Sequence, residues 1–185
     1  MSKEIEKEVR YLIDENIKNE ISKKCELVKK SYYTIDIVVG LDGFNSLNNY
    51  GYILRIRDKG KKKYVENKRR LENGDFIEQR IEVDDVKTPL NFFMNMGYEP
   101  YLVIEREREE LNYKSLKIFV DNISLLGTFV EIEYQDNDLD VVKEFIEMFN
   151  IISEPQDLYG DIFKRKVLEE EFRVKFDELV KRCIK

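Results

Sequence analysis

The sequence predicts an α+β protein in which eight antiparallel strands close into a β-barrel and the helices pack outside it. Two observations carry this prediction. Eight short segments alternate apolar with charged residues, as strands with one polar face do, and the segments between them repeat apolar residues at helical spacing. Eight antiparallel strands are enough to close into a barrel, which removes exposed sheet edges and leaves a lumen for a ligand. With the apolar faces under helices, that lumen would be polar.

The first half of the chain supplies five of the predicted strands. The first covers residues 4–13, and Asp14 is then expected to cap a helix that runs to about Lys29, because apolar residues recur at helical spacing up to Val28. Further strands are predicted over residues 32–39, 52–57, 62–70 and 76–84, with a loop over 40–49 and tight turns near Gly60 and Gly74.

The second half supplies three more strands and the remaining helices. A short helix is expected from Pro89 to a glycine cap at Gly97, and a longer one after Asp138. Strands are predicted over residues 101–111, 116–121 and 128–134, and a charged helix over residues 164–185 closes the chain. No shift in composition marks a second domain, so residues 1–185 are predicted to form one domain.

The composition excludes several functional classes. The net charge of -6 argues against a general nucleic-acid binder, and no apolar run approaches the ~18 residues that would span a membrane. Two cysteines without a disulfide pattern favour a reducing compartment, so a cytoplasmic protein is expected. The chain contains no histidine, so any metal should be a hard ion held by oxygen, such as Mg²⁺ or Mn²⁺.

The polar faces of the predicted strands are almost entirely charged. A solvated sheet face would also alternate, but it would be expected to include more Ser, Thr and Gln. Clustered Arg and Lys suit phosphate, and clustered Glu on neighbouring strands suits Mg²⁺ or Mn²⁺, so a face with both suits a metal-bound polyphosphate. These faces contain Glu6, Glu8, Arg10, Arg55, Arg57, Lys68, Arg70, Arg80, Glu82, Arg106, Arg108, Glu131 and Glu133.

Several of these segments together resemble the CYTH family, the triphosphate tunnel metalloenzymes. Residues 6–10 resemble its ExExK signature, and residues 54–57 its LRIR strand. Lys68 resembles the lysine of its TxK motif, Arg80 with Glu82 its RxE pair, and residues 106–108 its KxR strand. Residues 121–133 resemble its D...LGxFxEIE segment, and Tyr159 its late tyrosine. Each motif is weak alone, but their common order extends the resemblance over almost the whole chain.

The resemblance implies a role for each set of residues. The eight strands would form a closed tunnel, and the metal ligands would be Glu6, Glu8 and Glu133, with Glu131 as a further candidate. Lys68 is the proposed catalytic residue, because a lysine among arginines can have its pKa lowered enough to position or deprotonate water. The residues expected to hold the triphosphate are Arg10, Arg55, Arg57, Lys68, Arg70, Arg80, Arg106 and Arg108.

Three positions depart from the family pattern. Arg10 and Arg106 stand where the motifs have lysine, and Glu66 stands where TxK has threonine. Arginine keeps the positive charge but does not release its proton near neutral pH, so phosphate binding survives at both places while proton transfer does not. The purpose of the additional carboxylate at Glu66 is not given by the sequence.

The predicted function is therefore metal-dependent hydrolysis of a triphosphate, with Mg²⁺ or Mn²⁺ as cofactor. The partner would be a small triphosphate such as tripolyphosphate, ATP or thiamine triphosphate, with no nucleic acid and no membrane; a homodimer is left open. One alternative is a class IV adenylyl cyclase, which converts ATP to cyclic AMP and pyrophosphate. The other is a module that binds polyphosphate or nucleotides without turnover.

Overall fold

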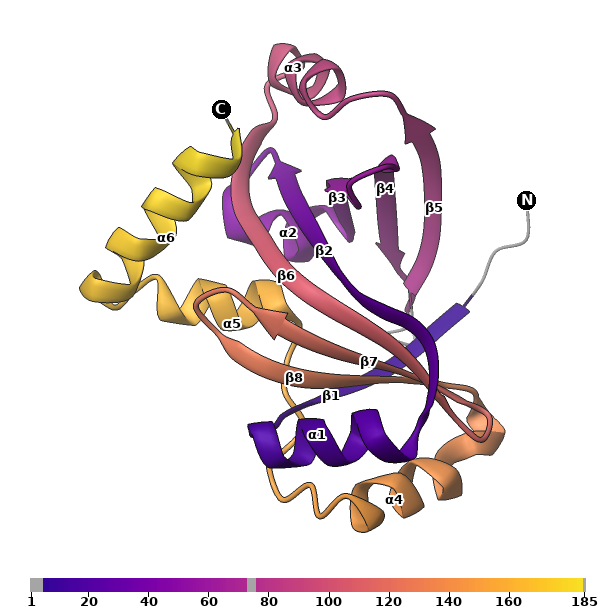
Figure 1. The fold of residues 1–185 in the computed structure, drawn as a ribbon. Coiled ribbons are helices and arrows are strands. Elements are labelled where there is room, and N and C mark those ends of the chain that lie inside the picture. The colour runs from indigo at the N-terminus through magenta and orange to yellow at the C-terminus, as the bar shows by residue number, and fades with distance from the viewer. Residues whose placement is uncertain (1–4, 73–75, 185) are drawn as a thin grey trace. The chain divides into compact units, whose positions relative to one another are not determined.

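The computed structural model describes residues 5–72 and 76–184, which form eight β-strands and six α-helices (Figure 1). Every strand pair described below is antiparallel. The predicted α+β class and the number of strands are confirmed. Within the described ranges, no helix combines the length and the apolar character that crossing a membrane would require.

The strands are β1 (Ile5–Leu12), β2 (Glu26–Gly40), β3 (Tyr52–Asp58), β4 (Lys63–Arg70), β5 (Phe76–Val83), β6 (Glu99–Tyr113), β7 (Leu116–Ile123) and β8 (Gly127–Tyr134). The α-helices are α1 (Glu15–Lys24), α2 (Ser46–Tyr50), α3 (Lys87–Asn95), α4 (Leu139–Met148), α5 (Tyr159–Lys166) and α6 (Glu170–Ile184). Two 3₁₀ helices, η1 (Gly43–Asn45) and η2 (Asp136–Asp138), precede α2 and α4.

The chain divides into two compact units, each assembled from segments that are far apart in the sequence. Unit 1 is built mainly from residues 34–105 and 158–185, and unit 2 from residues 6–33 and 106–157. The two long strands β2 and β6, each of 15 residues, contribute one end to each unit. Each unit therefore has its own sheet segment and its own apolar core.

In unit 1, neighbouring strands follow the order β5–β4–β3–β2. The register places Ile56 of β3 between Ile37 and Val65, so apolar side chains share one face of the sheet. Leu90 of α3 and Leu179 of α6 pack against this face, and both are almost fully buried. The charged helix α6 is thus a packing element of unit 1 through its apolar stripe.

In unit 2, neighbouring strands follow the order β1–β8–β7–β6. Ile132 of β8 lies opposite Val9 and Ile118, which again gathers apolar side chains on one face. Figure 1 shows α1 and α4 covering this face, and Ile21 and Phe145 from these helices belong to its core. Burying a side chain of this kind contributes about 1.5–3 kcal/mol, so the helices fix which face of the sheet stays polar.

The predicted helix up to Lys29 was too long. Asp14 does cap α1, because its Oδ1 accepts a hydrogen bond from the Ile17 amide at 2.8 Å, but α1 ends at Lys24. Cys25 already has extended backbone angles, and β2 begins at Glu26 rather than at Tyr32. The helical spacing of Val28 was therefore coincidental; this residue is more than half exposed on the strand.

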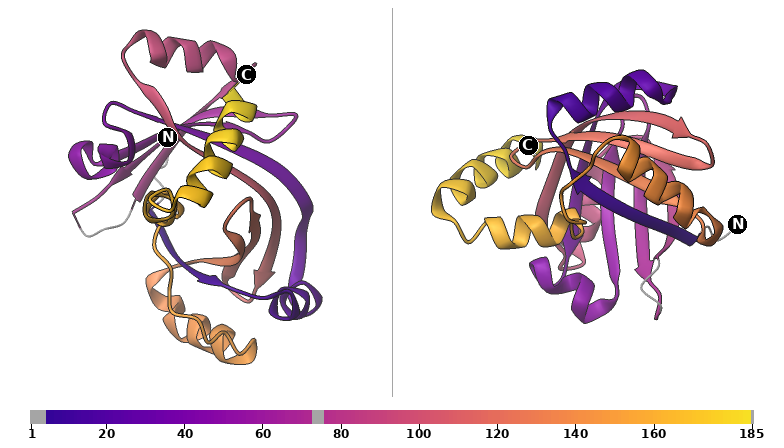
Figure 2. Two further views of the ribbon diagram at one scale, coloured as in Figure 1. Left: turned by 90° about the vertical axis from the view of Figure 1, so that its left-hand side faces the viewer. Right: turned by 90° about the horizontal axis from the view of Figure 1, so that it is seen from below.

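Two other segments contain more helices than the sequence predicted. Residues 40–49 do not form a plain loop, because η1 and α2 occupy most of this range. The single helix predicted over residues 164–185 is instead the pair α5 and α6, which Figures 1 and 2 show joined at an angle. Val167 caps α5, and α6 restarts at Glu170 with two acidic residues in its first turn, which favours a new helix start.

Candidate functional site

The polar face of unit 2 brings together the glutamates and arginines that the sequence singled out. In the register of β1 and β8, Glu8 lies opposite Glu133 and Arg10 lies opposite Glu131. In the register of β6 and β7, Arg108 lies opposite Asp121. Because side chains two residues apart point to the same face of a strand, all six belong to one charged surface.

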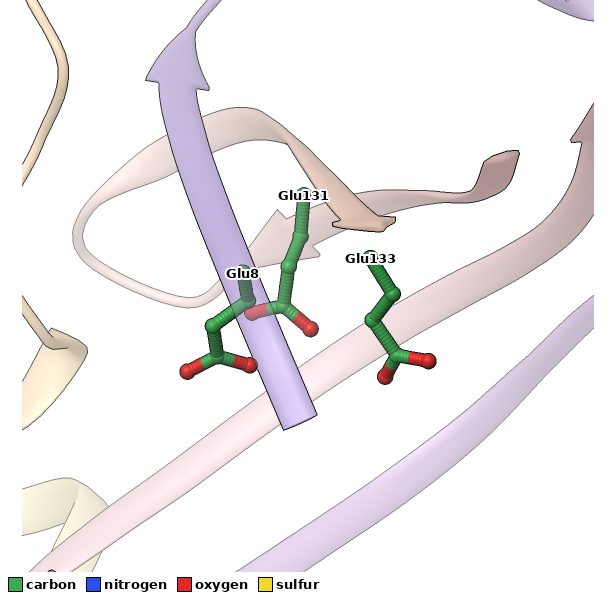
Figure 3. Close-up of side chains that lie close together, drawn as sticks. All are labelled: Glu8, Glu131 and Glu133. Atoms are coloured by element: carbon green, nitrogen blue, oxygen red, sulfur yellow. The ribbon is translucent and has the colours of Figure 1, made fainter. Parts of the chain in front are cut away.

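Three of these glutamates form a carboxylate cluster. Glu8, Glu131 and Glu133 each offer one oxygen, and these oxygens lie within 4.8 Å of one another. Figure 3 shows the side chains extending from β1 and β8 toward a common region. Glu131 is buried, and the other two are partly buried. Such a set of oxygen donors could bind a hard divalent cation, as the absence of histidine required. The side chain of the fourth predicted ligand, Glu6, lies outside the described residues.

Two arginines neutralise part of this cluster. Arg10 Nη2 lies 3.2 Å from Glu131 Oε2 and also pairs with Glu8, and Arg108 Nη2 lies 2.9 Å from Glu131 Oε1. Both oxygens of Glu131 therefore accept hydrogen bonds from guanidinium groups. Glu131 is therefore the least available metal ligand of the three, and the two arginines lie where they could also contact an anion bound to the metal.

Asp121 organises the other arginines of this face. It is fully buried on β7, and its carboxylate accepts hydrogen bonds from Arg108 Nε and Nη2, both at 2.6 Å. Arg106 Nη1 approaches the same carboxylate at 3.2 Å. The Arg108 guanidinium also lies 4.3 Å from the centre of the Phe119 ring. From the sequence, Asp121 could be recognised only as part of a motif, because its partners on β6 are defined by the strand register.

The polar face of unit 1 carries a second network of charges. Arg57 pairs with Asp36 through two hydrogen bonds of 2.6 and 2.7 Å, and its Nη1 lies 3.1 Å from Glu66 Oε2. Arg55 Nε donates to the same Glu66 oxygen at 2.6 Å. Asp36 and Glu66 are completely buried, so this network is largely shielded from water. Neither carboxylate was assigned a role from the sequence.

Lys68, the predicted catalytic residue, belongs to the same network. Its Nζ lies 3.3 Å from Glu78 Oε2, which is also 3.6 Å from Arg55 Nη2. Burial acts to raise the pKa of Glu78, but the nearby Arg55 and Lys68 outweigh it and hold this pKa below its ordinary value. Glu78 therefore remains ionised at neutral pH and forms an ion pair with Lys68.

The remaining predicted residues of unit 1 lie further out on its strands. Arg80 is exposed on β5, where its guanidinium lies 5.5 Å from the centre of the Tyr64 ring. Arg70 is exposed at the end of β4, and its backbone amide donates to Gly51. The structure thus places Arg55, Arg57 and Lys68 in one buried network and the other two basic residues at exposed positions.

A family model of the CYTH domain matches residues 4–165, which is most of the chain. The chain therefore belongs to the CYTH domain family, and the resemblance inferred from its motifs is confirmed. Among curated proteins, no sequence matches the chain significantly.

Solved structures share the fold at low sequence identity. PH1012 from Pyrococcus horikoshii has a TM-score of 0.72 and 19% identity, covering 84% of this chain and 98% of its own. A protein from Bacillus halodurans provisionally assigned as an adenylate cyclase has a TM-score of 0.70 and 19% identity, covering 88% and 99%. HpAC1 from Hippeastrum, described as having a dominant triphosphatase activity, has a TM-score of 0.61 and 14% identity, covering 87% and 94%. At such identities the likeness establishes the fold alone.

Proposed function

We propose that this protein hydrolyses a triphosphate with the help of a divalent metal ion. The observation that carries the proposal is the carboxylate cluster of Glu8, Glu131 and Glu133 on the same sheet face as Arg10 and Arg108. Carboxylates alone would suit only a metal, and arginines alone only an anion, whereas the combination suits a metal-bound polyphosphate. Membership of the CYTH family supports the same assignment.

The proposal includes an arrangement of the whole chain. The two units form one domain, and their eight strands close into a barrel whose lumen is lined by both polar faces. Apolar faces covered by helices in each unit support this arrangement, because they leave the charged faces for the interior. The residues proposed to bind the triphosphate are Arg10, Arg55, Arg57, Lys68, Arg70, Arg80, Arg106 and Arg108.

The metal would be Mg²⁺ or Mn²⁺, held by Glu6, Glu8 and Glu133, with Glu131 as a further candidate. It would supply positive charge next to the phosphate oxygens. The arginines would fix the phosphates and stabilise the charge that develops on them, which is the main contribution of a protein to phosphoryl transfer. Lys68 would hold the terminal phosphate and position the attacking water.

Two other functions use the same site. An adenylyl cyclase would direct the ribose 3'-hydroxyl of ATP to the α-phosphorus, and the likeness to the Bacillus halodurans protein favours testing it. A module that binds polyphosphate without turnover is favoured by the arginines at positions 10 and 106, which cannot transfer protons at neutral pH.

Product analysis distinguishes the three functions. The purified protein is incubated with Mg²⁺ or Mn²⁺ and, in parallel, with tripolyphosphate, ATP or thiamine triphosphate, and the products are separated by anion-exchange chromatography. Orthophosphate, released fastest from tripolyphosphate, is the expected result. Cyclic AMP and pyrophosphate as products would instead identify an adenylyl cyclase. Binding of a substrate without any product would identify a non-catalytic binding module.

A further inference from the structure

The basic residues on the polar face of unit 1 are already matched by acidic ones. Arg55, Arg57 and Lys68 carry three positive charges, and Asp36, Glu66 and Glu78 carry three negative charges within ion-pair distance of them. A triphosphate that used these basic groups would therefore have to compete with carboxylates of the protein itself. This competition makes the strength of each internal pair important for ligand affinity.

The carboxylates differ in how completely they are bound. Both oxygens of Asp36 accept hydrogen bonds from Arg57, in the two-pronged geometry that makes such pairs strong. Glu66 contacts Arg55 and Arg57 through Oε2 alone, and its buried Oε1 has no hydrogen-bond partner in the part of the chain that the structure describes. A buried acceptor without a partner costs about 1–3 kcal/mol, so Glu66 is the less firmly held carboxylate.

The guanidinium group of Arg55 also makes fewer hydrogen bonds than its nitrogens could donate. Its Nε donates to Glu66 at 2.6 Å, whereas Nη1 and Nη2 lie 3.6 Å from Asp36 and Glu78, which is beyond hydrogen-bond distance. Arg55 and Lys68 each keep about an eighth of the side chain exposed. A phosphate can therefore approach the guanidinium edge that Glu66 occupies in part.

We propose that Glu66 is an internal competitor of the triphosphate for Arg55 and Arg57, and that it sets the affinity of the site. This inference rests on the proposed function. In the absence of ligand, Glu66 neutralises the two guanidinium groups; when the triphosphate binds, its phosphate oxygens replace Glu66 Oε2. A single phosphate gains too few contacts to displace a buried carboxylate, whereas a polyphosphate contacts several basic groups at once. Glu66 thus favours polyphosphate chains over orthophosphate.

The test is the affinity of Glu66→Gln for tripolyphosphate, measured by calorimetry in EDTA so that turnover does not interfere. Glutamine keeps the size of the side chain and removes its charge. The dissociation constant is expected to fall about tenfold or more, equivalent to at least about 1.4 kcal/mol. The affinity for orthophosphate is expected to rise as well, so the ratio of the affinities for tripolyphosphate and orthophosphate should become smaller. Glu99→Gln, at an exposed position of β6, is the matched control and should bind as wild type does.

Thermal unfolding separates this role from a purely structural one. Without ligand, Glu66→Gln should melt at a lower temperature, because Arg55 and Arg57 lose a counter-charge. Saturating tripolyphosphate should then raise the melting temperature by more than it does in wild type, because the binding is tighter. Glu78→Gln, whose side chain is 16% exposed, provides a second variant that disturbs the fold less and should also bind tripolyphosphate more tightly.

Two results would overturn the inference. If wild type binds tripolyphosphate and neither variant binds it more tightly, Glu66 is a structural residue and the proposed function stands. If neither wild type nor the variants bind tripolyphosphate, with or without Mg²⁺, the proposed function fails and the inference fails with it.

Discussion

At the scale of single residues, Asp36 is a tightly held carboxylate of unit 1. It is fully buried and forms two short hydrogen bonds with Arg57, which is itself only 7% exposed. The pair compensates two charges that would each be costly to bury alone. Asp36 thereby fixes the direction of the Arg57 guanidinium, and so prepares one of the groups proposed to bind phosphate.

Asp36→Asn should therefore lower the free energy of unfolding by about 3 kcal/mol, because Arg57 is left buried without its main counter-charge. Urea unfolding followed by circular dichroism measures this loss. Asp140→Asn is the control, because Asp140 pairs with Lys143 on the surface of α4 and its side chain is 95% exposed; it should change stability by less than about 0.5 kcal/mol. Equal losses in the two variants would contradict the role given to Asp36.

The residues of the carboxylate cluster could be predicted, whereas the internal counter-charges could not. Glu8, Glu131 and Glu133 lie in short motifs with a two-residue spacing, which places them on one strand face whatever the rest of the chain does. Asp36 and Glu66 meet their arginines only through pairings between strands. The register depends on which sheet faces the helices cover, so it cannot be predicted from a local sequence pattern.

At the scale of elements, strands with alternating residues were predicted well and helix limits less well. The start of β2 was missed because Val28 continues the helical spacing of α1, and only the extended backbone at Cys25 ends the helix. No Gly or Pro lies at the break between α5 and α6. In both cases no Gly or Pro marks the boundary, although basic residues lie in the last turn of each helix, so tertiary packing determines where the helix ends.

The junction between β2 and α2 depends on a glycine. A Cβ added at Gly40 would lie 2.2 Å from Ser46 Oγ and 2.9 Å from Tyr101 Cε1. Ser46 cannot easily move away, because it is buried and its hydroxyl accepts a hydrogen bond from the Asp42 amide at 3.1 Å. The close approach of these two segments therefore requires the smallest residue at position 40.

Gly40→Ala should destabilise the protein by about 1–3 kcal/mol through overpacking, measured as a lower midpoint in urea. Gly160→Ala is the matched control. Its added Cβ would meet Leu102 at an ordinary 3.5 Å, and alanine in α5 should stabilise the protein by about 0.4–1 kcal/mol. Wild-type stability in Gly40→Ala would mean that the junction has more room than the structure shows.

At the scale of the whole molecule, both units follow one plan. Each has an apolar sheet face under helices and a charged face with buried arginines and carboxylates. The alternation of charged and apolar residues predicted this plan, since it depends only on the period of a strand. That the eight strands close into a barrel stays a prediction.

The measurement that tests the central claim most directly is orthophosphate release from tripolyphosphate by wild type and by Glu133→Gln, in Mg²⁺ or Mn²⁺. We expect turnover by wild type and a loss of at least about a hundredfold in Glu133→Gln, because the substitution removes a charged oxygen from the carboxylate cluster. Glu147→Gln, on the exposed side of α4, should retain full activity. Undiminished release by Glu133→Gln would contradict the assignment of this cluster as the metal site.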